Sequence, residues 1–248
     1  MSNTPSITKC EVLLADLKRG CTRRLVDEVA VETSLAVYIN GRKYSVLSAS
    51  PTEIRELIMG YLMTEGLIRR IDEISKLEVF EGRVDVHLRR ARRSRGDPSN
   101  PHGDEASPVR FSSKAIVDVI EDLNSLAEIH RRTGGVHAAA LADESGSIQA
   151  ISEDISRYSA VDKAVGKAAL RGLNMRRLLL ALTGRVSSGI AIKAASMGIP
   201  VIASMSAPTD LGVKVSSERG ITLIGFACRD RLNIYSHPER IIIEEYDG

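Results

Sequence analysis

The stretch from residue 178 to residue 188, Leu-Leu-Leu-Ala-Leu-Thr-Gly-Arg-Val-Ser-Ser, decides the fold. Its first five residues are apolar without interruption, which is typical of a central strand buried on both faces of a sheet. Thr183 and Gly184 follow this strand, and Ser187 begins a stretch to Met197 that predicts a helix. A buried strand that runs into a helix is the repeating unit of an α/β domain.

The same alternation of strand and helix patterns extends over the second half of the chain. The further predicted strands are Val136–Ala142, Ser147–Ile151, Pro200–Ala203 and Thr222–Phe226, and the further predicted helices are Ile116–Ile129, Ser159–Gly172 and Thr209–Glu218. Alternation at this spacing implies right-handed crossovers and a largely parallel sheet with helices on both faces. We therefore predict an α/β fold, with a three-layer α/β/α domain at residues 111–248.

Residues 1–110 predict a small α+β domain. Leu35–Ser48 alternates apolar and polar residues around Asn40-Gly41, a strong hairpin signal. A second hairpin is predicted across Glu81-Gly82. Between the hairpins, Ser50-Pro51-Thr52-Glu53 has the composition of a helix start, with a capping serine and a first-turn proline. The helix is predicted at Ile54–Met63 and closes at Gly66.

A basic run and a loop-forming segment separate the two predicted domains, at about residues 89–110. The run contains Arg89, Arg90, Arg92, Arg93 and Arg95. Gly96–Pro108 follows and is rich in Pro, Gly, Asp, Ser and Asn, as in a linker or a flexible loop. The basic run is interpreted first as a solvated strand end and second as a docking patch for a polyanion or an acidic partner.

Composition excludes several classes of protein. The 248 residues have a formal net charge of +2, no Trp and 3 Phe, which argues against a nucleic-acid-binding surface or a base-stacking platform. No apolar run is long enough for a membrane span, and Met1–Glu11 lacks the apolar core of a signal peptide. The 3 cysteines, Cys10, Cys21 and Cys228, form no C-x-x-C pair, so a reducing, cytoplasmic setting is expected.

The loops that follow the predicted strands have the composition of an anion site. These loops are 183–188, 204–209 and 225–231, and ligands of open α/β sheets collect at this edge. Helix starts at Ser187 and Thr209 offer backbone N–H groups and the positive end of a helix dipole. Arg185 and Arg231 add forked donors for phosphate oxygens. The simpler interpretation, that Ser187 and Thr209 are helix caps only, stays open.

Two upstream clusters add further candidates. Thr133-Gly134-Gly135-Val136-His137 places a Gly-Gly turn and a histidine at a strand start. Glu153 to Arg157, with Asp162-Lys163, gathers ionisable groups around one helix start. Taken singly, His137 is more typical of a structural histidine and Asp162-Lys163 of a solvated pair. Together these residues are interpreted as candidate site or site-scaffold residues.

These motifs resemble, in order, those of the formate dehydrogenase accessory sulfurtransferase (FdhD) family. Residues 133–139 are similar to its T-G-G-x-H-A-A motif, 153–163 to E-D-V-G-R-H-N-A-V-D-K, 183–187 to S-G-R-x-S and 204–209 to S-x-S-A-P-T. Residues 225–238 resemble G-F-x-x-x-x-R-x-x-x-Y-x-x-P, 32–41 resemble E-x-P-L-x-I-x-V-N-G, and 60–66 resemble G-F-L-x-T-E-G. The resemblance covers nearly the whole chain.

The resemblance implies a C-terminal domain related to the cytidine deaminase fold and a homodimer. It implies binding of the bis-molybdopterin guanine dinucleotide cofactor, which GDP or GMP would mimic. It also implies that sulfur is accepted from a cysteine desulfurase and passed to the cofactor before insertion into formate dehydrogenase. The expected cofactor-binding residues are Thr133, Gly134, Gly135, His137, Arg157, Asp162, Lys163, Arg185, Ser187, Ser206, Ala207, Thr209, Phe226, Ala227, Cys228, Arg229, Asp230 and Arg231.

The sequence departs from the family pattern at the sulfur-carrying position. The family's C-x-x-C loop should precede the helix that begins near Ser113, yet Arg89–Ser113 contains no cysteine. A persulfide needs a thiolate, which serine does not supply. Residues 155–159, Ile-Ser-Arg-Tyr-Ser, stand in place of V-G-R-H-N and keep only the arginine, Arg157, unchanged. Cys228 is the candidate substitute thiol, although a core or rim position explains it equally well.

Two functions follow from these observations. The first is a sulfur carrier that works through a relocated cysteine, as the resemblance implies. The second is a cofactor-binding chaperone without sulfur transfer, which the retained loops and missing cysteine pair favour. A zinc deaminase, suggested by the fold alone, lacks the H-x-E or C-x-E and P-C-x-x-C ligands that such enzymes need, and no metal site is expected.

Overall fold

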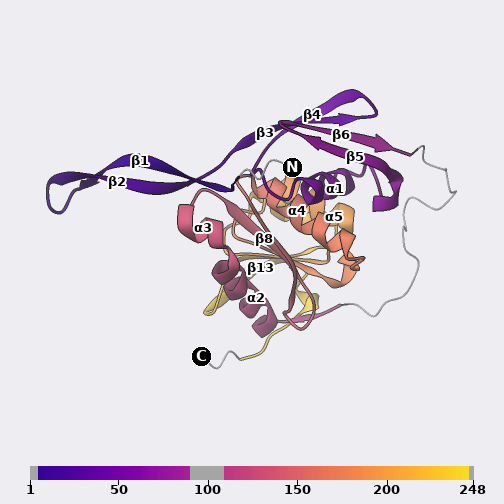
Figure 1. Ribbon diagram of the computed structural model, residues 1–248. Helices are drawn as coiled ribbons and strands as arrows, with labels where there is room; N and C mark the ends of the chain where they lie inside the picture. Colours follow the sequence, from indigo (N-terminus) through magenta and orange to yellow (C-terminus); the bar gives the residue numbers. More distant parts are fainter. Residues whose placement is uncertain (1–4, 90–108, 246–248) are drawn as a thin grey trace.

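A six-stranded mixed sheet forms the centre of the C-terminal half of the protein (Figure 1). The computed structural model describes residues 5–89 and 109–245. The strands lie in the order β13-β12-β11-β10-β8-β9. Their bounds are β8 His137–Ala142, β9 Ile148–Asp154, β10 Leu179–Leu182, β11 Val201–Ser204, β12 Thr222–Cys228 and β13 Arg231–Ser236.

The sheet is less parallel than the sequence predicts. Strands β10, β11 and β12 are parallel, as expected for strands joined by helices. Strand β8, however, pairs antiparallel with both β9 and β10, and β13 pairs antiparallel with β12. Hairpin partners need only a short turn and therefore run in opposite directions. The β8–β9 hairpin inserts β8 between β9 and β10, so the prediction of a largely parallel sheet is wrong.

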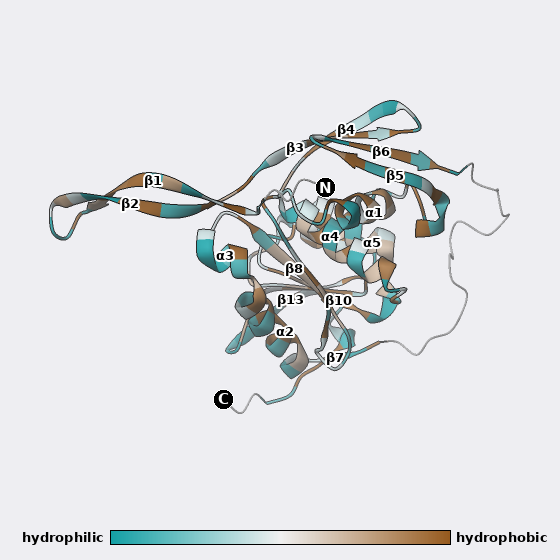
Figure 2. Cartoon of the chain, viewed as in Figure 1, coloured by the Kyte–Doolittle hydropathy of each residue, from teal (hydrophilic) through white to brown (hydrophobic). Residues whose placement is uncertain are grey.

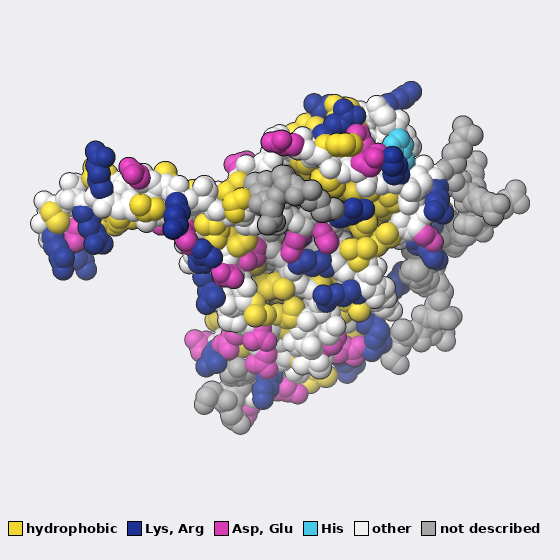
Figure 3. All heavy atoms as spheres, viewed as in Figure 1, with side chains coloured by type: hydrophobic (Ala, Val, Ile, Leu, Met, Phe, Trp, Pro, Cys, Tyr) yellow, Lys and Arg dark blue, Asp and Glu magenta, His cyan; other side chains and the backbone are white. Residues whose placement is uncertain are grey.

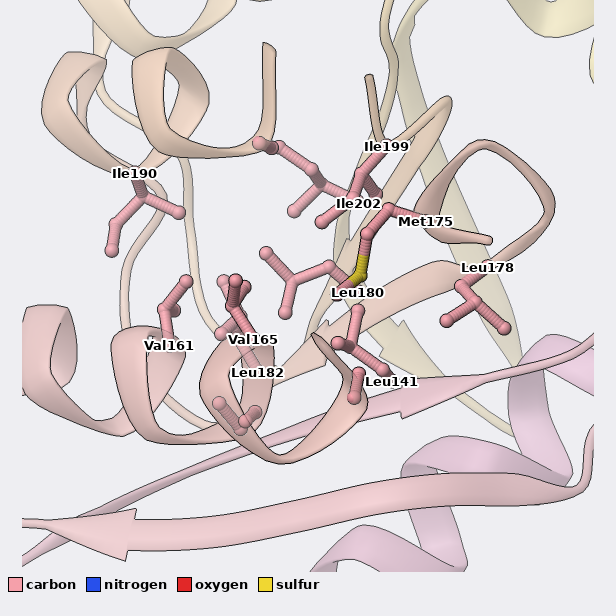
Figure 4. Close-up of a cluster of buried hydrophobic side chains, with 14 of the residues drawn as sticks. Leu141, Val161, Val165, Met175, Leu178, Leu180, Leu182, Ile190, Ile199 and Ile202 are labelled. Atoms are coloured by element: carbon pink, nitrogen blue, oxygen red, sulfur yellow. The ribbon is translucent and has the colours of Figure 1, made fainter. Parts of the chain in front are cut away.

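Helices cover both faces of this sheet, as the three-layer prediction requires. Helix α2 (Ser113–Leu126) packs on one face, and α4 (Arg157–Leu170) and α5 (Ser188–Met197) pack on the other. Figure 4 shows Val161 and Val165 of α4 gathered with Leu180 and Leu182 of β10. All four residues of β10 are buried, which confirms its central position. Burial of apolar surface on both faces is the main source of stability for such a strand.

The remaining elements of this half lie around the sheet. The predicted helix Ile116–Ile129 divides into α2 and a short helix α3 (Glu128–Thr133). Helix α6 (Asp210–Glu218) connects β11 to β12, and the short strands β7 (Phe111–Ser112) and β14 (Ile241–Ile242) pair in parallel. Short 3-10 turns lie at Ile71–Glu73, Met175–Arg177 and Pro238–Arg240.

A second sheet of four strands, in the order β4-β3-β6-β5, lies in the N-terminal half. Its bounds are β3 Thr33–Ile39, β4 Arg42–Ala49, β5 Ile74–Phe80 and β6 Arg83–Leu88. Asn40 and Gly41 both have positive φ, so the Asn-Gly hairpin forms as the sequence predicts. Helix α1 (Ile54–Thr64) packs on this sheet through Leu57, Ile58 and Leu62.

The start of α1 differs from the prediction. Its N-cap is Glu53, in a left-handed conformation with φ 56 and without a side-chain cap. Ser50 instead bonds across to the C-terminal half, where its N–H donates to Asp154 Oδ2 and its hydroxyl accepts from the N–H of Ile155. Ser50 therefore joins the two halves of the molecule and does not cap a helix.

Helices α1 and α4 cross in close contact between the two halves. A Cβ atom at Gly60 would lie 1.7 Å from the carbonyl oxygen of Asp162, and one at Gly166 would lie 2.0 Å from that of Glu56. Only glycine fits at either position. The contact places the N-terminal sheet and α1 as further layers over the α4 side of the large sheet (Figure 1).

A long two-stranded ribbon extends away from the body (Figure 1). It consists of β1 (Ile7–Asp16) and β2 (Cys21–Ala30) in antiparallel pairing. Cys10 and Cys21 lie on these strands and are exposed. Hydrophobic and hydrophilic residues are interspersed along the ribbon (Figure 2), so neither of its faces forms an apolar core.

Part of the predicted linker cannot be compared with the structure. Arg90, Arg92, Arg93 and Arg95, and the loop Gly96–Pro108, lie outside the described residues. Arg89 follows β6 and donates its N–H to the carbonyl of Glu73. In residues 5–89 and 109–245, no helix combines the length and apolarity needed to cross a lipid bilayer.

Candidate functional site

The candidate site lies at one rim of the six-stranded sheet. Strands β9 to β12 end at this rim, because β9 is parallel to β10 through the intervening β8. The antiparallel strands β8 and β13 begin there. His137 therefore starts β8 next to the end of β10, and Arg231 starts β13 next to the end of β12. Segments far apart in the sequence thus meet at one edge.

Backbone hydrogen bonds join the rim loops into one surface. The N–H of Val186 donates to the carbonyl of Ala207 at 3.2 Å, and the N–H of Thr209 donates back to Val186 at 2.9 Å. The N–H of Phe226 donates to the carbonyl of Ser206 at 3.2 Å. Ser204 Oγ bonds the carbonyl of Gly184 at 2.8 Å. The loops that carry Arg185, Ser206 and Phe226 are therefore contiguous.

The two helix starts at this rim differ. Thr209 caps α6, because its hydroxyl accepts from the N–H of Gly212 at 3.0 Å. Ser187 occupies the N-cap position of α5 but makes no side-chain cap bond. Its hydroxyl instead bonds Tyr158 Oη at 2.9 Å. The first turn of α5 thus has no N-cap side chain to accept from its N–H groups, which leaves them available to an anion.

His137, Arg157 and Gly184 form the centre of the rim. A Cβ atom at Gly184 would lie 3.0 Å from His137 Nδ1 and 3.5 Å from the Cβ of Arg157. The guanidinium of Arg157 lies 4.5 Å from the ring centroid of Tyr158 and donates to its hydroxyl at 3.0 Å. Its Nε is buried and has no partner among the described residues. That N–H remains available for an acceptor supplied by a ligand.

The electrostatic field at this point is positive. Burial lowers the pKa of His137 below its ordinary value, and the charge of Arg157 lowers it further. His130 and Arg185 act in the same direction. The hydrogen bond between the Tyr158 and Ser187 hydroxyls lowers the pKa of Tyr158. His137 is therefore neutral near pH 7, while Arg157 and Arg185 supply the positive charge.

Strand β12 ends in a distorted segment that positions Phe226 and Arg231. Phe226 has φ 52, an uncommon value for a residue other than glycine, and lies at a register shift between β12 and β13. The guanidinium of Arg231 lies 5.0 Å from the ring centroid of Phe226. Cys228 pairs with Arg231 in the ladder and is exposed.

Some predicted residues lie away from the rim surface. Ala227 is buried in the core under α2, and Arg229 binds Glu121 on α2. Asp230, in contrast, is exposed in the turn between β12 and β13, at the rim end of both strands. Sequence adjacency to Phe226 therefore does not give Ala227 the same direction, because successive residues of a strand point to opposite faces.

Asp162 and Lys163 are buried between the two halves of the molecule and do not face the rim. Lys163 Nζ lies 2.6 Å from Asp154 Oδ2, and both side chains are 0% exposed. Asp162 accepts from Thr64 at 2.7 Å and pairs with Lys193 at 3.0 Å. The sequence allowed either a binding-site role or a scaffold role for Asp162 and Lys163, and the structure supports the scaffold role. Because Lys163 is paired with Asp154 and Asp162 with Lys193, the solvated Asp162-Lys163 pair is not formed.

A cavity of about 510 Å³ adjoins the rim at the base of the ribbon. Thr133 and Gly135 line it, and Gly134 ends α3 with φ 62. Its lining also includes Val29, Glu32, Ser48 and Ser156. Val29 and Ser48 belong to none of the sequence motifs, and Glu32 begins the 32–41 motif without any indication of a site, because the sequence does not show which loops these strands approach.

The chain is similar to known proteins over most of its length. Residues 30–242 match the FdhD/NarQ family. The chain is 34% identical over 234 residues to "Sulfur carrier protein FdhD" of Methanothermobacter thermautotrophicus, covering 89% of this chain and 94% of the relative. It is 30% identical over 247 residues to the protein of the same name from Bacillus subtilis, covering 90% and 94%.

A solved structure has the same fold. The crystal structure described as a formate dehydrogenase accessory protein from Desulfotalea psychrophila aligns with a TM-score of 0.82 and 27% sequence identity. The alignment covers 96% of this chain and 100% of the other. The motifs at the rim, the sequence match over residues 30–242 and the shared fold lead to one conclusion: this chain belongs to the FdhD/NarQ family.

Proposed function

We propose that this protein is a formate dehydrogenase accessory protein that binds the bis-molybdopterin guanine dinucleotide cofactor through the diphosphate of a guanine nucleotide end. The observation that carries the proposal is the start of α5. The hydroxyl of its N-cap residue, Ser187, bonds Tyr158 and does not accept from the N–H groups of the first helical turn. Arg157 and Arg185 lie at the same rim, and Arg157 has a buried Nε without a partner among the described residues. Such a site favours an anion with several acceptor oxygens.

The residues present fit this group. Arg185 is exposed and carries a forked donor, and Arg231 presents a second one over the Phe226 ring. His137 is neutral near pH 7 and supplies a hydrogen bond without adding charge. In this arrangement the protein binds and orients the nucleotide end, and the chemistry of the metal centre belongs to the cofactor.

Substitution of exposed arginines, at the rim and away from it, tests whether the rim binds the nucleotide. Arg185→Ala should weaken GDP binding by about 1–3 kcal/mol, because a charge-assisted bond to phosphate is lost. Arg231→Ala should act in the same direction. Arg219→Ala is the matched control, since Arg219 is exposed at the opposite end of α6. Equal GDP affinity in the three variants and the unmodified protein, measured by calorimetry, would remove these arginines from the site.

Sulfur transfer is a second candidate function, and the position of Cys228 favours it. Cys228 is exposed and pairs with Arg231 at the rim end of β12. Its thiolate would attack the sulfane sulfur of a persulfide on a cysteine desulfurase. A new S–S bond would form on Cys228, the desulfurase S–S bond would break, and the desulfurase thiolate would leave.

A persulfide-trapping assay separates the two functions. The protein is mixed with a cysteine desulfurase and free cysteine, alkylated, and analysed by mass spectrometry. Label on Cys228 that disappears in Cys228→Ser, but not in Cys10→Ser or Cys21→Ser, supports sulfur transfer at the rim. Guanine nucleotide binding without label on any cysteine leaves cofactor binding alone as the function.

We also propose that the protein acts in the cytoplasm as a homodimer, with a cysteine desulfurase and formate dehydrogenase as partners. The ribbon supports the dimer. Leu13 and Val26 lie on one of its faces, diagonal to each other, and are 65% and 60% exposed. A two-stranded ribbon is marginally stable alone in water, so a second copy packed on this face would stabilise it.

A further inference from the structure

The cavity at the base of the ribbon adjoins the rim. It lies between the ribbon, strand β4 and the loops that precede β8 and α4. Gly135 and Ser156 line it, and each comes shortly before a central rim residue, His137 or Arg157. A ligand whose phosphates bind at the rim can therefore place an attached ring system in this cavity. The inference below rests on the proposed function, because it concerns the ring of the nucleotide whose phosphates are proposed to bind at the rim.

The polar lining of the cavity leaves one strong acceptor free. Thr133 Oγ1 donates to the carbonyl of Ile129 and accepts from Gly135, and Ser156 Oγ caps α4. Glu32 accepts a hydrogen bond from the Ser48 hydroxyl on one carboxylate oxygen, and its other oxygen has no partner among the described residues. A carboxylate repels phosphate and accepts from N–H donors.

The apolar lining fits a flat ring. Val29, Ala30 and Ile155 line the same cavity as the Glu32 carboxylate. A ring with its faces against aliphatic side chains and its N–H edge against a carboxylate satisfies both kinds of lining. Two adjacent donors, a ring N–H and an exocyclic amino group, match one carboxylate in a two-point contact. Adenine and cytosine lack two such adjacent donors.

We propose that Glu32 recognises the 2-amino-4-oxopyrimidine edge that guanine and pterins share, and that the cavity at the base of the ribbon is the ring-binding part of the nucleotide site. Glu32 is thus the residue that gives the site its preference for guanine over other bases. The arginines at the rim bind phosphates of any nucleotide, and the cavity selects the ring.

The experiment compares nucleotides that differ at this edge. GDP, IDP and ADP are titrated into the full-length protein and into Glu32→Gln by calorimetry. IDP lacks the 2-amino group and therefore one of the two donors. We expect the unmodified protein to prefer GDP to IDP by about tenfold, and Glu32→Gln to lose about tenfold in GDP affinity with little change for IDP. Glu81→Gln, in the exposed β5–β6 turn, is the matched control.

The outcomes separate this inference from the proposed function. If the unmodified protein binds no guanine nucleotide, the proposed function fails. If it binds GDP but Glu32→Gln keeps the same GDP-to-IDP ratio, the inference about Glu32 is overturned while nucleotide binding at the rim stands. Glu32 is exposed, so the variant should fold, and an unchanged melting temperature checks this.

A second titration identifies which ring occupies the cavity. GMP and 6-hydroxymethylpterin are each tested for competition with GDP in the unmodified protein and in Glu32→Gln. Competition by GMP that depends on Glu32 assigns the cavity to guanine. Competition by the pterin that depends on Glu32 assigns it to the pterin end. If neither competitor depends on Glu32, the cavity does not bind this edge.

Discussion

Buried ion pairs and hydrogen bonds link individual residues of the two halves of the molecule. Asp162 of α4 is bonded to Thr64 of α1 and to Lys193 of α5, and Lys193 also contacts Glu65 at 2.9 Å. Lys193 is nearly buried, and Asp162 is 2% exposed. Two buried charges are stabilising only when each is well paired, so removal of one partner is costly.

Asp162 should make stability depend on pH in a defined window. Burial raises the pKa of Asp162 from 3.8 to about 6, against the opposing effect of Lys193. The folded chain therefore holds this proton at pH values where the unfolded chain has lost it. Its contribution to the free energy of unfolding should fall, on the order of 2 kcal/mol, as pH rises from about 4 to about 6, and then stay level.

The comparison of the unmodified protein with Asp162→Asn isolates this contribution. Urea unfolding at pH 4, 5, 6 and 7 gives the difference in unfolding free energy between the two proteins. Asp122→Asn, an exposed change on α2, should give a difference that does not vary with pH. If the unmodified protein instead gains unfolding free energy relative to Asp162→Asn as pH rises from 4 to 6, pairing with Lys193 outweighs burial.

At the scale of elements, the crossing of α1 and α4 fixes the N-terminal sheet on the large domain. Glycine is required on both helices, at Gly60 and Gly166, because the backbones themselves are in contact. The sequence places both glycines inside predicted helices, where glycine is otherwise unfavourable. Their cost to each helix is offset by the close packing that they permit.

Gly60→Ala tests this packing. Alanine stabilises an exposed helix by about 0.5–1 kcal/mol relative to glycine. Here the added methyl group would lie 1.7 Å from the carbonyl oxygen of Asp162, so the helices must separate. We expect a loss of about 3 kcal/mol in unfolding free energy, measured by urea denaturation at pH 7. Ser217→Ala, at an exposed position of α6, should be nearly neutral. A midpoint for Gly60→Ala at or above that of the unmodified protein would contradict the close crossing.

The sequence predicts elements well where local signals are strong. The Asn40-Gly41 hairpin and the buried strand β10 have local causes, namely turn chemistry and an uninterrupted apolar run. The ribbon was missed because β1 and β2 carry charged residues on both faces and lack a core-facing stripe. The reversed direction of β8 was missed because the place of a hairpin within a sheet depends on contacts between distant segments.

The candidate site could be predicted only in part for the same reason. Arg185 and Thr209 follow predicted strands, so their rim position is a consequence of topology. Glu32 opens the 32–41 motif, but its place beside Thr133, Gly135 and Ser156 depends on contacts between distant segments, which the motif does not reveal. Asp162 has the residue type of a site but is buried, and burial is a property of the folded chain alone.

At the scale of the whole molecule, the ribbon is the largest feature outside the compact body. Hydrophobic side chains lie among charged ones along it (Figure 3), and Leu17 at its free end is 92% exposed. Within residues 5–89 and 109–245, neither edge of the ribbon pairs with another strand, and unpaired edges are prone to associate with other chains. In the proposed homodimer, a second protomer would cover this arm and stabilise it.

Two lysines on one face of the ribbon should weaken the dimer. In Leu13→Lys/Val26→Lys, apolar contact would be lost and like charges would face the second protomer. We expect the dimer dissociation constant from sedimentation equilibrium to rise at least about tenfold. Val46→Lys, at a 53% exposed position of β4, is the control and should leave association unchanged. A protein that is monomeric at every concentration, or a dimer indifferent to the ribbon change, would rule out the ribbon as the interface.

A crystal structure of the protein with GDP would show whether the rim and the adjoining cavity hold one nucleotide. We expect the diphosphate at the rim, with oxygens within hydrogen-bond distance of the α5 N-terminus and of the Arg185 or Arg157 guanidinium. We also expect the guanine ring in the cavity lined by Glu32. A diphosphate bound away from the 183–188 and 204–209 loops, or no bound nucleotide at saturating GDP, would contradict nucleotide binding at the rim.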